Sequence, residues 1–350
     1  MAWIGAGRMS WWRSASAVAA GLVAAAVPAS ATGAWRVEPG PVSSTAQLSS
    51  VSCVSVTVCA AVGTIGNSSP TFKTYAESRS GSKWSVVPSS GPAGSELNGL
   101  SCVAADWCQA VGESANLGAF LIEHWDGHTW SPVATPVPSS SSLNSVSCTS
   151  RAWCVAVGSR VGQSQVGTAV ERWYGTKWST VSSPNPDVTY SYLWGVSCVS
   201  PSWCAAVGES FPSSGVGSQT LAETWNGKTW RIVPSPSLPN ELNQLASVDC
   251  VSSTWCIAAG NTETGGLIER WDGHTWTIVA HPSAKQENAG FSSVACASRT
   301  ACTAVGSVVE SWNGHVWSPV ALPGGAYSVS CPTATVCKAV GRGTKIYTKN

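Results

Sequence analysis

The sequence predicts an all-β protein, a seven-bladed β-propeller with four-stranded blades, from three observations. Seven cysteine pairs share the spacing C-x5-C, and most recur at intervals of about 45 to 50 residues, which is typical of a repeat architecture. In five repeats a segment of the form Trp-x-Gly-x-x-Trp follows the cysteine pair. The two ends of the chain carry complementary fragments of one further repeat.

Each repeat predicts four short strands. The first ends at the leading cysteine, as in "WGVSC", and the second starts at the trailing cysteine, as in "CAAVG". The third and fourth flank a glycine turn, as in "LAETWNGKTWRIV". Asp-Gly and Asn-Gly there predict two-residue hairpin turns in which both residues take positive φ. Pro/Ser-rich stretches such as "ATPVPSSSS" are predicted loops. Four-stranded units repeated radially are typical of a propeller.

The chain ends predict how the ring closes. The last repeat stops at "KIYTKN", after its third strand, whereas "GAWRVEPGP" at 33–41 matches "KTWRIVPSP" at 228–236. We therefore expect the N-terminal strand to complete the C-terminal blade, so that six whole blades and two fragments make seven. This closure hides sheet edges that would otherwise be exposed. A solenoid would instead carry polar capping repeats at each end.

The first residues predict a secretory leader. Arg8 and Arg13 precede an apolar stretch from Ala15 to Val27, and Ala29-Ser30-Ala31 has the form of a signal peptidase site. This stretch is shorter than the roughly 20 residues that a membrane-spanning helix needs. We expect residues 1–31 to be a cleavable signal peptide and 32–350 to be a single propeller domain without a transmembrane segment. The expected location is secreted or in the cell envelope, although retention of the leader as an anchor stays open.

The composition of the chain argues against nucleic acid, metal ions and cofactors as ligands. The formal net charge is +1 and only 11% of residues are charged, without a Lys/Arg cluster, so we expect no nucleic-acid partner. The chain has 14 cysteines, an even number, which favours disulfides in an exported protein. A zinc site would need four ligands at closer spacing, so we expect no metal and no cofactor.

The cysteine pairs are predicted to be structural disulfides. Two cysteines opposite each other in a hairpin come within disulfide reach after a small adjustment. We expect seven local bridges: Cys53–Cys59, Cys102–Cys108, Cys148–Cys154, Cys198–Cys204, Cys250–Cys256, Cys296–Cys302 and Cys331–Cys337.

These repeats resemble a known group of proteins. The segments S-V-S-C-x5-C-x-A-V-G and E-x-W-[DN]-G-x-x-W resemble secreted propeller-repeat proteins common in actinobacterial genomes, over nearly the whole mature chain. The resemblance implies an exported propeller and no particular ligand. The D-G-x-T-W turn is also similar to the Asp-box of sialidase-like propellers, although Asp and Gly are adjacent here and separated there.

Recurring polar and aromatic residues are interpreted as structural. A carboxylate recurs at one repeat position, and six copies spread around a ring cannot converge on one bond, whereas a glycosidase needs one pair about 5 to 10 Å apart. These residues are Glu77, Glu123, Glu171, Glu223, Glu269 and Glu310. We expect each to bond an indole N–H or a backbone amide of the adjacent blade. Trp pairs such as Trp125/Trp130 are expected in the core between blades.

Function is expected where the repeats differ, because repetition marks the scaffold. The segment "NPDVTYSYLWGVSC" departs most from the pattern. Its Trp194 stands four residues before Cys198, where other repeats have Ser49, Asn98, Asn144, Ala246, Ser292 and Tyr327. This position should surround the mouth of the central channel. We predict Trp194, Tyr190, Tyr192 and Tyr327 as ligand-binding residues; the alternative is that "YSYLW" only fills a gap between blades.

Three functions remain from the sequence. We expect a monomeric, non-catalytic propeller that serves as a binding or scaffold module for an extracellular or envelope partner, a protein or a glycan. A lectin-like propeller with Trp and Tyr as stacking surfaces is the alternative, and a sialidase-like glycoside hydrolase is the third. No catalytic residue is predicted, since no G-x-S-x-G, H-E-x-x-H or phosphate-binding glycine loop occurs. Enzymatic activity stays open.

Overall fold

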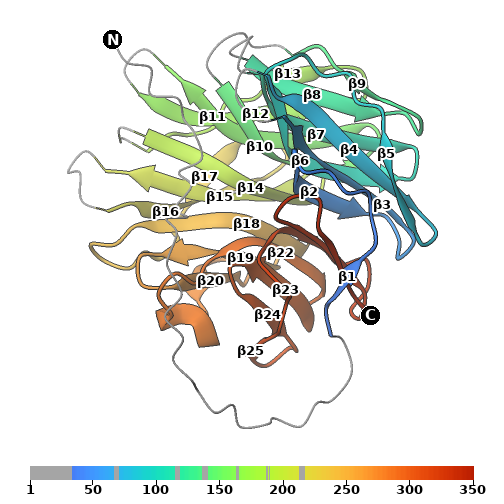
Figure 1. Ribbon diagram of the computed structural model, residues 1–350. Coiled ribbons are helices and arrows are strands. Elements are labelled where there is room, and N and C mark those ends of the chain that lie inside the picture. The colour runs from blue at the N-terminus through green and yellow to red at the C-terminus, as the bar shows by residue number, and fades with distance from the viewer. Residues whose placement is uncertain are drawn as a thin grey trace. The chain divides into compact units, whose positions relative to one another are not determined.

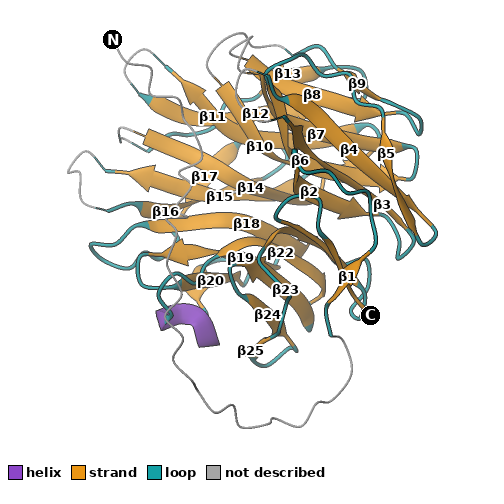
Figure 2. Cartoon of the chain, viewed as in Figure 1, coloured by secondary structure: helices purple, strands orange, loops and turns teal. Residues whose placement is uncertain are grey.

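The structure is a computed structural model that describes residues 34–66, 71–114, 119–135, 141–162, 165–186, 188, 190–212 and 217–350. The predicted leader, residues 1–31, lies outside this range. Antiparallel strands make up most of the described chain, and η1 (Pro282–Lys285), a 3-10 helix, is the one helical element within it (Figures 1 and 2).

The strands form four-stranded units, which we number in chain order. The first contains β2 (Ala46–Cys53), β3 (Val58–Ile65), β4 (Lys73–Ser80) and β5 (Lys83–Val87). The second contains β6 (Ser95–Ala104), β7 (Trp107–Ser114), β8 (Ala119–Trp125) and β9 (Trp130–Pro132). The third contains β10 (Ser141–Ser150), β11 (Trp153–Val161), β12 (Val166–Trp173) and β13 (Trp178–Thr180).

The remaining units repeat this order. The fourth contains β14 (Tyr190–Ser200), β15 (Trp203–Phe211), β16 (Gln219–Trp225) and β17 (Trp230–Val233). The fifth contains β18 (Asn243–Ser252), β19 (Trp255–Thr262), β20 (Gly266–Trp271) and β21 (Trp276–Ile278). The sixth contains β22 (Phe291–Ser298), β23 (Ala301–Gly306), β24 (Val309–Trp312) and β25 (Trp317–Pro319). A single parallel pairing, Val166 with Tyr190, joins the third and fourth units into one eight-stranded sheet.

The seventh sheet takes its fourth strand from the other end of the chain. It contains β26 (Ala326–Ser330), β27 (Cys337–Gly341), β28 (Ile346–Lys349) and β1 (Arg36–Glu38), which pairs antiparallel with β28 (Figure 1). Trp35, just before β1, is 5% exposed and packs among residues of the sixth and seventh sheets. Glu38 forms ion pairs with Lys338 of its own sheet, at 2.7 Å, and with Arg79 of the first sheet, at 2.9 Å.

The Ser-Val-Ser-Cys segment connects the first strands of neighbouring sheets. The serine before the leading cysteine accepts a hydrogen bond from the backbone N–H of the leading cysteine in the next sheet. These pairs are Ser52–Cys102, Ser101–Cys148, Ser147–Cys198 and Ser197–Cys250, at 3.0 to 3.1 Å. Ser330 accepts the same bond from Cys53 at 3.0 Å, across 277 positions of sequence. The last and first sheets therefore meet through the same contact as consecutive sheets.

The hydrophobic core lies between adjacent sheets. Trp125 and Trp130 of the second sheet, with ring centroids 5.6 Å apart, share one cluster with Val62 and Ala76 of the first sheet. The equivalent pair Trp225 and Trp230 packs against the third sheet. The expected placement of the Trp pairs between sheets is therefore confirmed.

The two local predictions from the repeats have different outcomes. All seven disulfides form within their own C-x5-C segments, as predicted. The two-residue turn is wrong: Trp125 and Trp130 pair across a four-residue loop, and only Gly127 has positive φ, 96°. The Asp126 carboxylate accepts the backbone N–H groups of His128 and Thr129, both at 2.8 Å. Because this side chain satisfies the turn, Asp126 itself does not need the left-handed conformation.

Candidate functional site

A β-bulge interrupts every first strand at the same repeat position. The bulged residues are Ser49, Asn98, Asn144, Trp194, Ala246, Ser292 and Tyr327. Each is at least partly exposed, whereas the residue before it is buried. In the second strand, the glycine of the Ala-Val-Gly segment pairs with the residue just before the bulge. Only glycine fits there, because a Cβ at Gly208 would overlap the carbonyl oxygen of Tyr192. The bulge therefore turns one residue per sheet toward solvent and requires glycine opposite.

Trp194 is the largest residue of this set and is held by a hydrogen bond. Asn144, its counterpart in the preceding sheet, donates to the Leu193 carbonyl at 2.9 Å. The indole Nε1 of Trp194 instead donates to Oε1 of Glu209 at 3.1 Å, and Gln244 of the fifth sheet donates to the same oxygen at 2.9 Å. Burial raises the pKa of Glu209, and the bonds from Gln244 and Trp194 oppose that rise. This network fixes the indole between the fourth and fifth sheets.

Four aromatic side chains gather at this end of the fourth sheet: Tyr190, Tyr192, Trp194 and Phe211, named here the aromatic cluster. Tyr192 and Trp194 stack with centroids 5.6 Å apart and an interplanar angle of 16°. Phe211 meets Tyr192 and Tyr190 edge-on, at 6.3 and 6.5 Å. Tyr190 is 45% exposed, and Tyr192 and Trp194 are half-buried. The cluster thus presents a partly exposed, rigid aromatic surface.

Three of the four predicted ligand-binding residues come together. Tyr327 lies at the equivalent bulge of β26, and in the described chain it makes no ring contact with the aromatic cluster. Sequence reasoning missed Phe211, Glu209 and Gln244. The sequence could have indicated Glu209 and Phe211, because they pair with Tyr192 and Tyr190 on the neighbouring strand. Counting residue pairs along the two strands, starting from Leu193 and Gly208, would have identified both.

The sheets end at different heights on the face that carries the connections from second to third strands and from sheet to sheet, named here the loop face. In the fourth sheet the β14–β15 pairing continues for three residue pairs beyond Leu193–Gly208. In the sixth and seventh sheets pairing stops at the equivalent pairs, Phe291–Gly306 and Ala326–Gly341. In the first, second, third and fifth sheets it continues for two pairs, so among the described pairings that of the fourth sheet, which carries the aromatic cluster, extends furthest.

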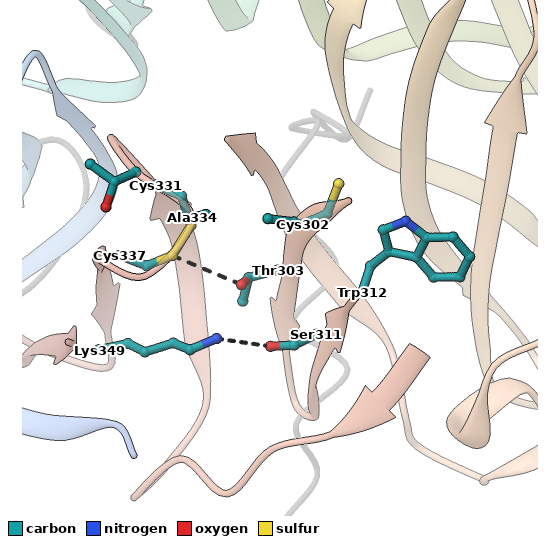
Figure 3. A pocket seen from close by; sticks show the side chains of 10 residues that line it. Cys302, Thr303, Ser311, Trp312, Cys331, Ala334, Cys337 and Lys349 are labelled. Atoms are coloured by element: carbon teal, nitrogen blue, oxygen red, sulfur yellow. Dashed lines mark hydrogen bonds between the residues drawn. A yellow bond between two sulfur atoms is a disulfide. The ribbon is translucent and has the colours of Figure 1, made fainter. Parts of the chain in front are cut away.

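Two hollows are lined by residues of the sixth and seventh sheets and their connections. A cavity of about 320 Å³ on the loop face is lined by residues that include Val309, Val320 and Leu322. A smaller pocket of about 30 Å³ lies between the sixth and seventh sheets, where Lys349 donates to Ser311 at 3.2 Å. Figure 3 shows the side chains that line it. Lys349 stands opposite the trailing cysteine, where Trp225 stands in the fourth sheet. The smaller pocket follows from this replacement, and its volume suits about one water molecule.

The six recurring glutamates are fully buried, but their partners differ from those expected. Hydroxyl groups of the preceding connection donate to three of them: Ser89 to Glu123, Ser183 to Glu223 and Ser235 to Glu269, each at 2.7 Å. Tyr75 donates to Glu77 and Thr180 to Glu171, and only Glu310 receives a backbone amide, from Ser283 at 2.9 Å. The expected indole donors are wrong, since the Trp125 and Trp225 indoles bond carbonyls of the first-to-second-strand turns.

These carboxyls are buried and do not share a site. Each is 0% exposed, and the partners of Glu77 and Glu171 lie within the same sheet as the glutamate itself. In the described ranges no group of three His, Cys, Asp or Glu side chains is placed to hold a metal ion. No helix there is long and apolar enough to cross a membrane.

The buried glutamates predict a pH dependence of stability. Burial raises the pKa of Glu77 and Glu171 to about 7 and of Glu223 and Glu269 to about 8, from an ordinary value of 4.5. Between pH 4.5 and 8 the folded state therefore binds more protons than the unfolded state, and its stability falls as pH rises. We expect the melting temperature to be several degrees lower at pH 8 than at pH 5, as measured by circular dichroism.

Glu223→Gln provides the matched control for this prediction. The amide keeps the shape and an acceptor for Ser183 but removes the titration, so the variant should gain stability over the wild type at pH 8 and little at pH 5. Identical pH profiles for the two proteins would contradict the assignment.

The repeated four-stranded sheets, with cores between neighbours, define the class of this protein as a β-propeller. Solved structures with this fold include YCF48 bound to D1 peptide, with a TM-score of 0.61 and 14% identity over 93% of this chain and 99% of that chain. YCF48 from Cyanidioschyzon merolae has a TM-score of 0.59 and 14% identity over 90% and 98%. The WD40 β-propeller domain of Doa1 has 0.61 and 12% over 90% and 97%. No protein-family model and no curated protein sequence matches this chain.

Proposed function

We propose that this chain is a secreted, non-catalytic, seven-bladed β-propeller that binds a protein partner through its loop face. In this proposal the seven sheets form a closed ring, and the seven bulged residues surround the mouth of its central channel. The pairing of β1 with β28 supports closure, as does the hydrogen bond from Cys53 to Ser330, which repeats the contact between consecutive sheets.

Secretion is part of the proposal. Seven disulfides suit an oxidising compartment. The leader expected at residues 1–31 and the resemblance to exported actinobacterial propellers point the same way. The partner is then an extracellular or envelope protein, met by a monomeric propeller.

The observation that carries the binding proposal is the aromatic cluster. The recurring serines, glutamates and Trp pairs all have packing roles between sheets, whereas Tyr190, Tyr192 and Trp194 recur in no other repeat. Tyr and Trp are enriched at protein interfaces because they bury large areas at low entropic cost. The bonds from Trp194 to Glu209 and from Gln244 to Glu209 preorganise this surface. YCF48, which shares the fold, is solved with a bound peptide.

Replacing Trp194 by alanine should abolish most of the binding. The probe is a phage-displayed library of random twelve-residue peptides selected on the mature protein, followed by fluorescence anisotropy with the selected synthetic peptides. We expect Trp194→Ala to weaken binding by at least about tenfold, since truncated interface hot spots typically cost 2 kcal/mol or more. The melting temperature should stay within a few degrees of the wild-type value.

Tyr174→Ala is the control, because Tyr174 is 46% exposed but lies in the turn between β12 and β13, at the opposite end of the sheets. It should leave binding unchanged. A large loss of stability in Trp194→Ala with intact peptide binding would mean that Trp194 is a packing residue. Selection of no peptide, together with binding on a glycan array, would replace the protein partner by a carbohydrate.

A further inference from the structure

The disulfide of the seventh sheet has different surroundings from the others. In five sheets a tryptophan of the third strand stands opposite the trailing cysteine. These pairs are Cys108–Trp125, Cys154–Trp173, Cys204–Trp225, Cys256–Trp271 and Cys302–Trp312. In the seventh sheet Lys349 stands opposite Cys337 instead. Because residues opposite each other on two strands project from the same face of the sheet, a lysine side chain replaces an indole beside the Cys331–Cys337 bridge.

The first sheet also has a cation at this position, but its charge is already paired. Arg79, opposite Cys59, forms an ion pair with Glu38 at 2.9 Å. The Lys349 ammonium instead donates to the Ser311 hydroxyl at 3.2 Å, and the ion pairs of the described residues do not include it. Burial lowers the pKa of Lys349 below its ordinary value, because the ammonium has lost hydration. A negative charge formed beside this ammonium would therefore be stabilised.

A hydroxyl group faces the buried sulfur of the same bridge. Oγ1 of Thr303 in the sixth sheet lies 3.9 Å from Sγ of Cys337, and the hydroxyl is the donor because a disulfide sulfur carries no hydrogen. Ser311, which holds the Lys349 ammonium, stands opposite Thr303 on the neighbouring strand. Figure 3 shows both polar contacts in the small pocket between the sixth and seventh sheets. A hydroxyl donor and an ammonium thus lie on the same side of this sulfur.

The trailing sulfur has less favourable neighbours in four other sheets, where it lies close to a backbone carbonyl oxygen. These contacts are Cys59–Ser55 at 3.8 Å, Cys108–Ala104 at 4.0 Å, Cys256–Ser252 at 3.9 Å and Cys302–Ser298 at 3.7 Å. A carbonyl oxygen only accepts hydrogen bonds, so it would repel a thiolate. The indoles opposite the cysteines offer no donor, because each donates to a carbonyl of a first-to-second-strand turn. A thiolate is therefore better stabilised at Cys337.

We propose that the Cys331–Cys337 bridge is a thiol-exchange site, which an external dithiol reduces before the other six bridges. Cys331 is partly exposed and Cys337 is 1% exposed, so an attacking thiolate reaches the Cys331 sulfur. A bond forms between these two sulfurs, and the bond between Cys331 and Cys337 breaks as Cys337 leaves as a thiolate. Departure is faster when the leaving thiolate is stabilised, and the Lys349 charge and the Thr303 hydroxyl provide that stabilisation.

The second thiol of the reductant completes the exchange. It loses its proton, attacks the sulfur of the reductant in the mixed disulfide, and releases Cys331. The dithiol is oxidised to a cyclic disulfide, and its two electrons and two protons pass to Cys331 and Cys337, which end as thiols. This chemistry does not depend on a partner for the loop face.

Partial reduction of the folded protein tests the order in which the bridges open. The mature chain is incubated with dithiothreitol under native conditions, quenched in acid at intervals and alkylated in denaturant, and mass spectrometry quantifies all 14 cysteines. We expect Cys331 and Cys337 to be reduced about tenfold faster than the cysteines of the five sheets with an opposite tryptophan. Equal rates for all seven bridges, or another bridge that opens first, would overturn the proposal.

Two conservative variants test the groups assigned to this step. Lys349→Met keeps the length of the side chain without its charge, and Thr303→Val keeps the shape without the hydroxyl. Each should slow the reduction of Cys331–Cys337 by about threefold or more and leave the other six rates unchanged. Lys345→Met, the matched control, removes an exposed charge just before β28 and should behave like the wild type.

The remaining outcomes also decide the proposal. If both variants open this bridge as fast as the wild type, the roles of Lys349 and Thr303 are wrong. If a variant opens all seven bridges faster, it is partly unfolded, and the order measured in the wild type then confirms or rejects the site by itself.

Discussion

Deleting residues 32–38 from the mature chain is expected to lower the free energy of unfolding by more than about 5 kcal/mol, or to prevent folding. The deletion removes Trp35, which is 5% exposed, and truncating a buried aromatic costs about 3 to 5 kcal/mol. It also removes Glu38 and so leaves Lys338 and Arg79 without their carboxylate partner. Breaking a buried ion pair in this way costs about 3 to 5 kcal/mol more. Finally, it exposes the edge of β28 to pairing with other chains.

Urea denaturation and size-exclusion chromatography of chains starting at residue 32 and at residue 39 would measure this loss. Glu38→Gln isolates the electrostatic part, because it keeps the strand and Trp35. Burial raises the pKa of Glu38, but Lys338 and Arg79 lower it by more, so the pKa lies below its ordinary value. The folded state therefore stabilises the ionised carboxylate. Arg36→Ser changes an exposed residue of β1 and should have little effect. If the truncated chain melts like the longer one, β1 does not hold the sheets together.

Reducing all seven disulfides is expected to unfold the protein at 37 °C. Each bridge closes a short loop, with a sequence separation of 6. The chain-entropy relation assigns about 2 to 2.5 kcal/mol to a loop of this size. Seven such terms approach or exceed the roughly 5 to 15 kcal/mol by which proteins are typically stable. Circular dichroism of reduced, alkylated protein should therefore show loss of tertiary structure.

A variant that lacks one disulfide measures how much a single bridge contributes to stability. Cys198→Ser with Cys204→Ser should cost about 2 kcal/mol and leave the fold intact, because six bridges and the inter-sheet cores remain. A reduced protein with the native melting temperature would show that the bridges contribute little. Any bridge between repeats, found by non-reducing peptide mapping, would contradict the local pairing.

The sequence by itself determined the features that depend on short spacings. The C-x5-C segments place both cysteines on one hairpin, so local disulfides needed no knowledge of the rest of the chain. The match of 33–41 with 228–236 likewise predicted that the first strand joins the last sheet, because one repeat unit was split between the ends. The Asp-Gly turn failed as a prediction since the Asp126 side chain satisfies the loop without left-handed backbone. Short segments predict pairing better than they predict loop geometry.

Only the tertiary structure decided the contacts between sheets, because these depend on registers set by residues far apart in sequence. The ion pair between Glu38 and Lys338 joins residues 300 positions apart, so no local sequence pattern predicts it. The serine partners of the buried glutamates come from connections of irregular length. The aromatic cluster needed the β14–β15 register to bring Phe211 and Glu209 to Tyr190 and Tyr192. The cavity of about 320 Å³ on the loop face lies where the short connection of Ser307 and Val308 joins β23 to β24, and its lining residues come together only when neighbouring sheets pack side by side.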